Sequence, residues 1–306
     1  MKQLALVTVA AARELDEDLA PLATALETQG AKVAIVDWDD PDVAWSRFAA
    51  AVLRSTWDYA MRLSEFLDWA ARVAEQTLLI NPAQIVRWNT DKHYLADIAR
   101  VGVATVRSTF VEPGDDAIAA LDTFLGGARD ARSISMGAAA DFAEFVVKPA
   151  VGAGSRDAQR HSRSQRDAAV EHVARLLDAR RSVLLQPYLE RIDTHGETAL
   201  IYFDGRFSHA IRKGPLLRRG EGPTSDLFAA EQIEPRSPSA EELRLGASAL
   251  AAIPFATPLT YARVDLVPDA LGAPCILELE LTEPSLFFAH ATGSATRCAS
   301  AILSRL

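Results

Sequence analysis

Short apolar runs alternate with segments of helical periodicity at the start of the chain, and this alternation constrains the fold more than any other feature. Residues 4–9, 33–36, 50–53 and 78–80 form short apolar runs, which are typical of buried parallel strands. Helices are expected at Leu15 to Leu26, before a stop at Gly30, and from Ser64, as an N-terminal cap, to Ala74. The pattern predicts a parallel, three-layer α/β unit.

The rest of the chain carries signals of antiparallel strands. Residues 198–203 and 206–211 are joined by Asp204-Gly205, a dipeptide that suits a type I′ turn. A second antiparallel pair is expected at 261–267 and 275–281, and shorter strands at 145–147 and 183–185 with a helix between them. Residues 214–238 are rich in Gly, Pro and charge, so we expect a mobile loop there. The fold class is therefore expected to be α/β followed by α+β.

Composition narrows the class of protein. The net charge of −9 and the lack of a basic patch disfavour nucleic-acid binding. No apolar stretch reaches the roughly 18 residues of a membrane span, and the start of the chain lacks the pattern of a signal peptide. The two cysteines have neither metal-ligand spacing nor the number needed for a disulfide framework. A soluble, cytoplasmic protein is expected.

A glycine-rich segment at 148–156 is the first candidate for chemistry. Glycines at 152 and 154 allow backbone N–H groups to approach phosphate oxygens, and Ser155 adds a hydroxyl donor. The segment is not a Walker A loop, because no Lys-Ser/Thr follows the last glycine. Taken alone, a flexible surface turn explains it better.

Carboxylates on expected strands form the second candidate. Glu278 and Glu280 are two residues apart and share one face of a strand, and Asp265 joins that face if the two strands pair. Hard carboxylate oxygens suit Mg²⁺. The alternative is a face that is solvated or paired with Arg and Lys.

Three further segments are candidates for binding, and each also has an explanation that involves no ligand. Arg212 and Lys213 end a strand and suit phosphate or carboxylate recognition, but, taken alone, a solvated strand end explains them better. Lys92, after Asn89-Thr90-Asp91, is also explained by the first turn of a helix. The polar side chains that follow the third strand lie where α/β sheets bind ligands, although a polar turn with Trp57 and Tyr59 packed inward is an equal alternative. These side chains are Arg54, Ser55, Thr56 and Asp58.

In this order, the segments from about Asn81 to Leu286 resemble the ATP-grasp superfamily, and the residues before them resemble the α/β unit that precedes the grasp in those enzymes. The resemblance implies a Rossmann-like pre-ATP-grasp domain at 1–104. It implies a small ATP-grasp subdomain with the glycine-rich flap at 105–190, and a C-terminal subdomain with the metal site at 191–306. It also implies ATP and Mg²⁺ as cofactors.

The resemblance assigns roles to individual residues. Lys92, Lys148, Gly152, Gly154 and Ser155 would bind the ATP phosphates, and Gln186, Tyr188, Leu189, Glu190 and Glu197 the adenine and ribose. Asp265, Glu278 and Glu280 would hold Mg²⁺, although the family usually has Asn where this chain has Glu280. Arg212 and Lys213 would be catalytic, and Arg54, Ser55, Thr56, Asp58, Arg263 and Ser285 would contact the substrate.

Within the superfamily, residues 54–59, 148–156 and 277–287 resemble the branch that contains D-cycloserine synthetase. This implies a ligase of antibiotic biosynthesis that activates a small amino-acid carboxylate as an acyl phosphate, with cyclisation of O-ureido-D-serine as the specific reaction. The alternatives are an intermolecular carboxylate–amine ligase of the glutathione-synthetase or peptide-tailoring kind, and a nucleotide-binding scaffold without turnover. The expected partner is a small amino-acid-like molecule, and a homodimer is common for such enzymes.

Overall fold

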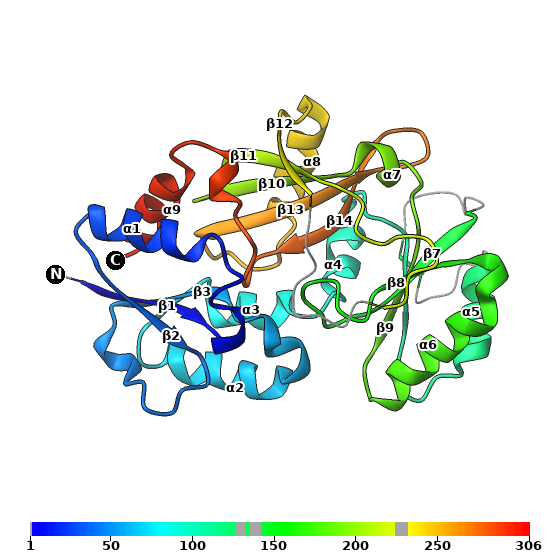
Figure 1. The fold of residues 1–306 in the computed structure, drawn as a ribbon, viewed down its shortest axis with the longest axis horizontal. Helices are drawn as coiled ribbons and strands as arrows, with labels where there is room; N and C mark the ends of the chain where they lie inside the picture. Colours follow the sequence, from blue (N-terminus) through cyan, green and yellow to red (C-terminus); the bar gives the residue numbers. More distant parts are fainter. Residues whose placement is uncertain (1, 127–132, 135–141, 224–231) are drawn as a thin grey trace.

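The computed structural model describes residues 2–126, 133–134, 142–223 and 232–306. Its strands form three sheets (Figure 1), one near the N-terminus, one in the middle of the chain and one built mainly from the C-terminal half. In that view the first sheet lies at the lower left, the second at the right and the third across the top.

The first sheet is parallel, as predicted. It has the order β2-β1-β3-β4 and consists of β1 (Gln3–Thr8), β2 (Lys32–Asp37), β3 (Ala50–Ser55) and β4 (Leu78–Ile80). Alternate residues of β1 enter different cores. Leu4 and Leu6 pack with α1 (Leu19–Thr28) and α9 (Ser294–Leu303), whereas Ala5 and Val7 pack with α2 (Leu63–Ala74). This two-sided burial confirms the three-layer arrangement.

The second sheet is antiparallel and has the order β6-β5-β9-β7-β8. Its strands are β5 (Ser108–Val111), β6 (Ser133–Ile134), β7 (Glu144–Pro149), β8 (Gln159–Ser162) and β9 (Val183–Pro187). Helices α5 (Ala117–Leu125) and α6 (Arg166–Asp178) share an apolar core with one face of this sheet. The other face is therefore left available to the centre of the molecule.

The third sheet is also antiparallel, with the order β12-β11-β10-β13-β14. Its strands are β10 (Glu197–Phe203), β11 (Arg206–Lys213), β12 (Ile233–Arg236), β13 (Tyr261–Pro268) and β14 (Pro274–Glu280). The predicted turn is confirmed, because Asp204 and Gly205 both have positive φ values, 51° and 72°. Helix α8 (Ala240–Ala251) packs on this sheet.

Shorter helices connect the sheets. They are α3 (Ala83–Asn89), α4 (Tyr94–Arg100) and α7 (Ile192–His195), with the 3₁₀ helices η1 (Ala10–Ala12), η2 (Trp45–Arg47), η3 (Trp57–Met61), η4 (Arg163–Gln165) and η5 (Phe288–His290). Asn89 at the end of α3 donates to the Leu279 carbonyl at 2.7 Å and accepts from the Leu281 N–H at 2.6 Å. These bonds hold the end of β14 against the helices that follow the first sheet.

One local expectation, the start of the second helix, was wrong, and another, the loop at 214–238, is tested only in part. Helix α2 starts at Leu63, with Arg62 in the capping position and no side-chain cap, so Ser64 lies inside the first turn. The expected loop at 214–238 contains strand β12, and its residues 224–231 lie outside the described residues. Within the described residues, no helix is long and apolar enough to cross a membrane.

Candidate active site

A cavity takes its lining from the second and third sheets and from the segment that follows the first sheet. Strands β7 and β9 contribute from the second sheet, β11, β13 and β14 from the third, and η3 from the segment after β3. The lining is rich in charge and includes Lys92, Lys148, Arg156, Glu197, Lys213, Arg263, Glu278, Glu280 and Glu283. Opposite charges therefore face one another across a space that is open to a polar molecule.

The glycine-rich loop forms one wall of this cavity. Gly152, Gly154 and Ser155 all line it, between the ends of β7 and β8. Gly154 and Ser155 both have left-handed φ values, 61° and 58°, which turn the chain sharply between the two strands. Lys148 lines the cavity from β7, and burial, with Lys92 and Lys213 nearby, lowers the pKa of its ammonium group.

The segment after β9 forms a second wall. Gln186, Tyr188 and Leu189 line the cavity. The Gln186 side chain donates to the Ser108 hydroxyl at 2.9 Å, and the guanidinium of Arg160 lies 3.5 Å from the centre of the Tyr188 ring. These contacts fix the segment in place and leave its backbone beside the cavity.

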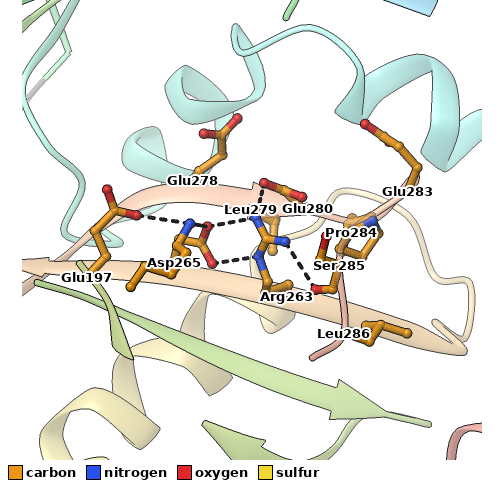
Figure 2. A network of polar contacts seen from close by, with 12 residues as sticks. Glu197, Arg263, Asp265, Glu278, Leu279, Glu280, Glu283, Pro284, Ser285 and Leu286 are labelled. Carbon is orange, nitrogen blue, oxygen red and sulfur yellow. Dashed lines mark hydrogen bonds and ion pairs between the residues drawn. The ribbon is translucent and has the colours of Figure 1, made fainter. Parts of the chain in front are cut away.

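The strand carboxylates meet as predicted, but each is paired with a cation. In the β13–β14 register, Asp265 lies opposite Glu278, with Arg263 opposite Glu280. Lys213 Nζ lies 2.7 Å from Asp265 Oδ2, and Arg263 bonds both Asp265 oxygens and also forms an ion pair with Glu280 (Figure 2). Asp265 itself is buried behind Lys213 and Arg263 and does not line the cavity.

These contacts shift the protonation of the carboxylates. Burial alone would raise the pKa of Asp265, but Arg263 and Lys213 lower it to about 2. Burial raises the pKa of Glu280 to about 8, and the neighbouring Asp265 and Glu278 add to the effect of burial. Burial and the neighbouring carboxylates thus oppose the ionisation of Glu280, whereas Arg263 and Lys213 keep Asp265 ionised.

The donor chemistry of this face fits Mg²⁺, which prefers carboxylate oxygens. Among the described residues, however, no three His, Cys, Asp or Glu side chains stand close enough together to hold a metal ion. The ion pairs with Lys92, Lys213 and Arg263 occupy the carboxylates instead. A metal would have to displace these cations.

Arg212, predicted as catalytic, and Glu190, predicted to bind the nucleotide, do not line the cavity. Arg212 and Lys213 are neighbours on β11 and so point to opposite faces. Lys213 lines the cavity, whereas Arg212 donates to the carbonyls of His195 and Thr194 at 2.8 and 3.2 Å. Glu190 is exposed and does not line the cavity, whereas Glu197 does and pairs with Lys213 at 3.0 Å. The cavity thus receives Lys213 and Glu197 in place of Arg212 and Glu190.

The polar residues at the end of β3 and just after it also lie away from the cavity. Arg54, Ser55 and Thr56 are at most 1% exposed, and none of them lines it. Arg54 instead donates to the Pro284 carbonyl at 3.0 Å, and Ser55 lies 2.7 Å from the hydroxyl of Thr8. Asp58 accepts from the Trp38 indole at 2.9 Å and pairs with Arg62 at 3.2 Å. Their contacts favour structural roles over the predicted contact with substrate.

The residues that do reach the cavity from this segment were not predicted as ligands. Trp57 and Tyr59, from η3, both line it, as does Glu283 from the segment after β14. Of the expected substrate residues, Arg263 and Ser285 line the cavity. Asp58, which lies between Trp57 and Tyr59, bonds Trp38 and Arg62 instead of lining the cavity.

Comparison with known proteins agrees with this architecture. Residues 4–81 match the family model of the D-cycloserine synthetase DcsG N-terminal domain. The cycloserine biosynthesis protein DcsG of Streptomyces lavendulae is 44% identical over 306 residues, which cover 99% of this chain and 98% of that protein. A crystal structure of D-cycloserine synthetase DcsG superposes with a TM-score of 0.88 at 43% identity, over 99% of both chains.

More distant structures share the fold. The ATP-grasp ligase PsnB complexed with minimal precursor has a TM-score of 0.63 at 18% identity, over 100% of both chains. The D-alanine–D-alanine ligase of Bacillus anthracis complexed with ATP has a TM-score of 0.67 at 14% identity, over 99% of this chain and 97% of that one. The chain therefore has the ATP-grasp fold, and it belongs to the DcsG family of D-cycloserine synthetases.

Proposed function

We propose that this chain is an ATP- and Mg²⁺-dependent ligase that cyclises O-ureido-D-serine to D-cycloserine through an acyl phosphate. The observation that carries the proposal is the meeting of the glycine-rich loop and the β14 carboxylates Glu278 and Glu280 in one cavity, in a chain 44% identical to a cycloserine biosynthesis protein. ATP, Mg²⁺ and a small amino acid all match the charge of that lining.

The nucleotide would lie between the second and third sheets. Lys92 and Lys148, with the loop residues Gly152, Gly154 and Ser155, would bind its phosphates through ammonium, backbone N–H and hydroxyl donors. The segment of Gln186, Tyr188 and Leu189 would bind adenine through its backbone, with Glu197 near the ribose.

Asp265, Glu278 and Glu280 would hold Mg²⁺ together with phosphate oxygens. The ion would supply charge neutralisation for the transferring phosphoryl group. Lys213 and Arg263, which hold these carboxylates in the present structure, would then be available to the phosphates and the substrate.

The chain's own residues would act mainly by positioning and by charge. A carboxylate oxygen of the substrate attacks the γ-phosphorus of ATP, and ADP leaves. We assign stabilisation of the developing charge to Arg263 in place of Arg212, because Arg263 lines the cavity.

Ring closure follows from proximity. The nitrogen bound to the side-chain oxygen attacks the acyl carbon and expels phosphate, and the tether gives this nucleophile a high effective concentration. Water then hydrolyses the carbamoyl group on that nitrogen to carbon dioxide and ammonia, which leaves D-cycloserine.

The test is ADP release from ATP and Mg²⁺ with a panel of small amino acids that includes O-ureido-D-serine, with mass spectrometry of the products. ADP formed with O-ureido-D-serine alone, together with a cyclised product, supports the proposal. ADP formed only with a separate acid and amine would replace it with an intermolecular ligase. If the protein binds ATP but releases no ADP in the presence of O-ureido-D-serine, the proposed reaction is contradicted.

Three broader expectations stay proposals of the same kind. They are the domain divisions after residues 104 and 190, assembly as a homodimer and a cytoplasmic location.

A further inference from the structure

Glu283 is the carboxylate of the cavity that the proposed nucleotide and metal roles leave unused. It lies three residues beyond the end of β14, is 8% exposed, and lines the cavity. In Figure 2 dashed lines join Arg263 to Asp265, Glu280 and Ser285, and Glu283 lies apart from this group. Glu283 thus faces a different part of the cavity from the carboxylates grouped around Arg263.

The partner of Glu283 also differs from those of the other carboxylates. Glu197 and Asp265 pair with Lys213, Glu278 pairs with Lys92, and Glu280 pairs with Arg263. Glu283 instead forms a hydrogen bond with the neutral phenol of Tyr59. Among the described residues, no cation lies within ion-pair distance of Glu283, so its charge lacks the compensation that the other four have.

Aromatic rings surround the same place. Trp57 and Tyr59 both line the cavity, and the Trp57 indole N–H donates to the backbone carbonyl of Glu283 at 3.3 Å. A carboxylate beside two aromatic rings is a favourable environment for an ammonium group, because the carboxylate and the faces of both rings attract a cation.

The backbone that carries Glu283 is fixed. Arg54 donates to the carbonyl of Pro284 at 3.0 Å, and Arg263 donates to that of Ser285 at 3.1 Å. Asp18 accepts from the N–H groups of residues 286–288 at 2.5, 2.9 and 2.8 Å. The carboxylate is therefore presented at a set position, as recognition of a small ligand requires.

We propose that Glu283, with Trp57 and Tyr59, binds the α-ammonium group of the amino-acid substrate and so selects α-amino acids over plain carboxylic acids. The inference rests on the proposed function, because it names the group by which that substrate is recognised. It makes Glu283 a specificity-determining residue, separate from the residues proposed for ATP and Mg²⁺.

The electrostatics of the site agree with a missing cation. Burial raises the pKa of Glu283 to about 7; Lys92, Tyr59 and Arg263 oppose this effect, and Glu278 adds to it. Lys92 is itself held by Glu278 at 2.8 Å and by the carbonyl of Gly152 at 3.0 Å. A ligand ammonium would supply the charge that these groups leave uncompensated.

The test compares the substrate with an analogue that lacks the α-amino group, 3-(ureidooxy)propanoic acid. Binding of each to the full-length protein, loaded with Mg²⁺ and a non-hydrolysable ATP analogue, is measured by calorimetry. We expect the native protein to bind the amino acid about 30-fold more tightly, the scale of one charge-assisted pair. Glu283→Gln should remove most of that preference by weakening the amino acid alone, with the affinity for the analogue unchanged within about 3-fold.

The control variant is Glu75→Gln, which removes the same charge at an exposed position on the far end of α2 and should keep the native preference. Equal weakening of both ligands by Glu283→Gln would overturn the inference, since that result indicates a structural role. A preserved preference would overturn it as well. If the native protein turns over a different amino acid, the proposed substrate fails, and the inference is tested on that amino acid and its own analogue without the amino group.

Discussion

The Nζ atom of Lys92 lies 2.8 Å from Oε1 of Glu278, and this pair joins a group proposed for the ATP phosphates to a group proposed for Mg²⁺. Lys92 precedes α4, whereas Glu278 is on β14, so the two are far apart in sequence, as is the neighbouring pair Tyr94 and Leu279, at 185 positions. The same ammonium donates to the carbonyl of Gly152 at 3.0 Å, in the glycine-rich loop. In this arrangement the two proposed sites neutralise each other, and Mg²⁺ and ATP together would replace both halves of the pair.

Glu278→Ala tests that exchange. The variant keeps Lys92 but removes a proposed metal ligand, so turnover should fall roughly 1,000-fold, the scale found for loss of one preorganised charge-stabilising group. ADP release at increasing Mg²⁺ measures the effect, and circular dichroism checks that the fold is retained. Glu234→Ala, an exposed glutamate of β12, is the control. Native ADP release by Glu278→Ala would remove Glu278 from the metal site.

Arg263 and Arg212 give opposite predictions. Arg263 lines the cavity and contacts Asp265 and Glu280, so Arg263→Lys should lower kcat about 100-fold, because an ammonium cannot reproduce the two-pronged contact. Arg212→Lys should keep kcat within about 3-fold, because its side chain bonds the carbonyls at the end of α7. Steady-state ADP release measures both variants. A larger loss in Arg212→Lys than in Arg263→Lys would restore the role that the sequence assigned to Arg212.

The difference between these arginines shows where prediction from the sequence ends. The parallel sheet and the Asp204-Gly205 hairpin follow from local periodicity and turn chemistry, so they are predictable. Which face of β11 meets the cavity depends on how two sheets pack, and local sequence does not encode that.

Long-range contacts limited the prediction for the residues after β3. Arg54 was a reasonable ligand candidate, since it ends a parallel strand in a polar segment. Its partner is the carbonyl of Pro284, which is 230 residues away in sequence, so the contact appears only in the folded chain. The same holds for Glu283, whose value as a candidate depends on Tyr59 and Trp57 lying beside it.

Asp18 should be important for stability because of its three backbone contacts. Its carboxylate is buried, accepts from the N–H groups of residues 286–288, and lies 3.8 Å from the guanidinium of Arg54. Asp18→Ala leaves these donors and a buried cation unpaired, so the free energy of unfolding should fall by about 3 kcal/mol. Urea unfolding measures the change, and Glu17→Ala, its exposed neighbour, should change stability by less than about 0.5 kcal/mol. Equal stabilities for the two variants would contradict the importance of these contacts.

His209 should make the folded protein sensitive to acid. Burial lowers the pKa of His209 to about 4, and its Nε2 atom lies 2.9 Å from the carbonyl of Leu286. The unfolded chain takes up this proton near the usual histidine pKa of about 6.5, whereas the folded protein resists it until about pH 4. The stabilisation that neutral His209 gives the folded protein is therefore fully present above about pH 6.5 and is lost as the pH falls toward 4.

The variant His209→Gln retains a hydrogen-bond donor but does not titrate. It should lower the free energy of unfolding at pH 7.5 and flatten the decline of that free energy between pH 6.5 and 4.5. His290→Gln, for a histidine that is not buried, should keep the native slope. Unfolding in urea across this pH range measures both slopes, and equal slopes in the native protein and His209→Gln would mean that other groups set the acid limit.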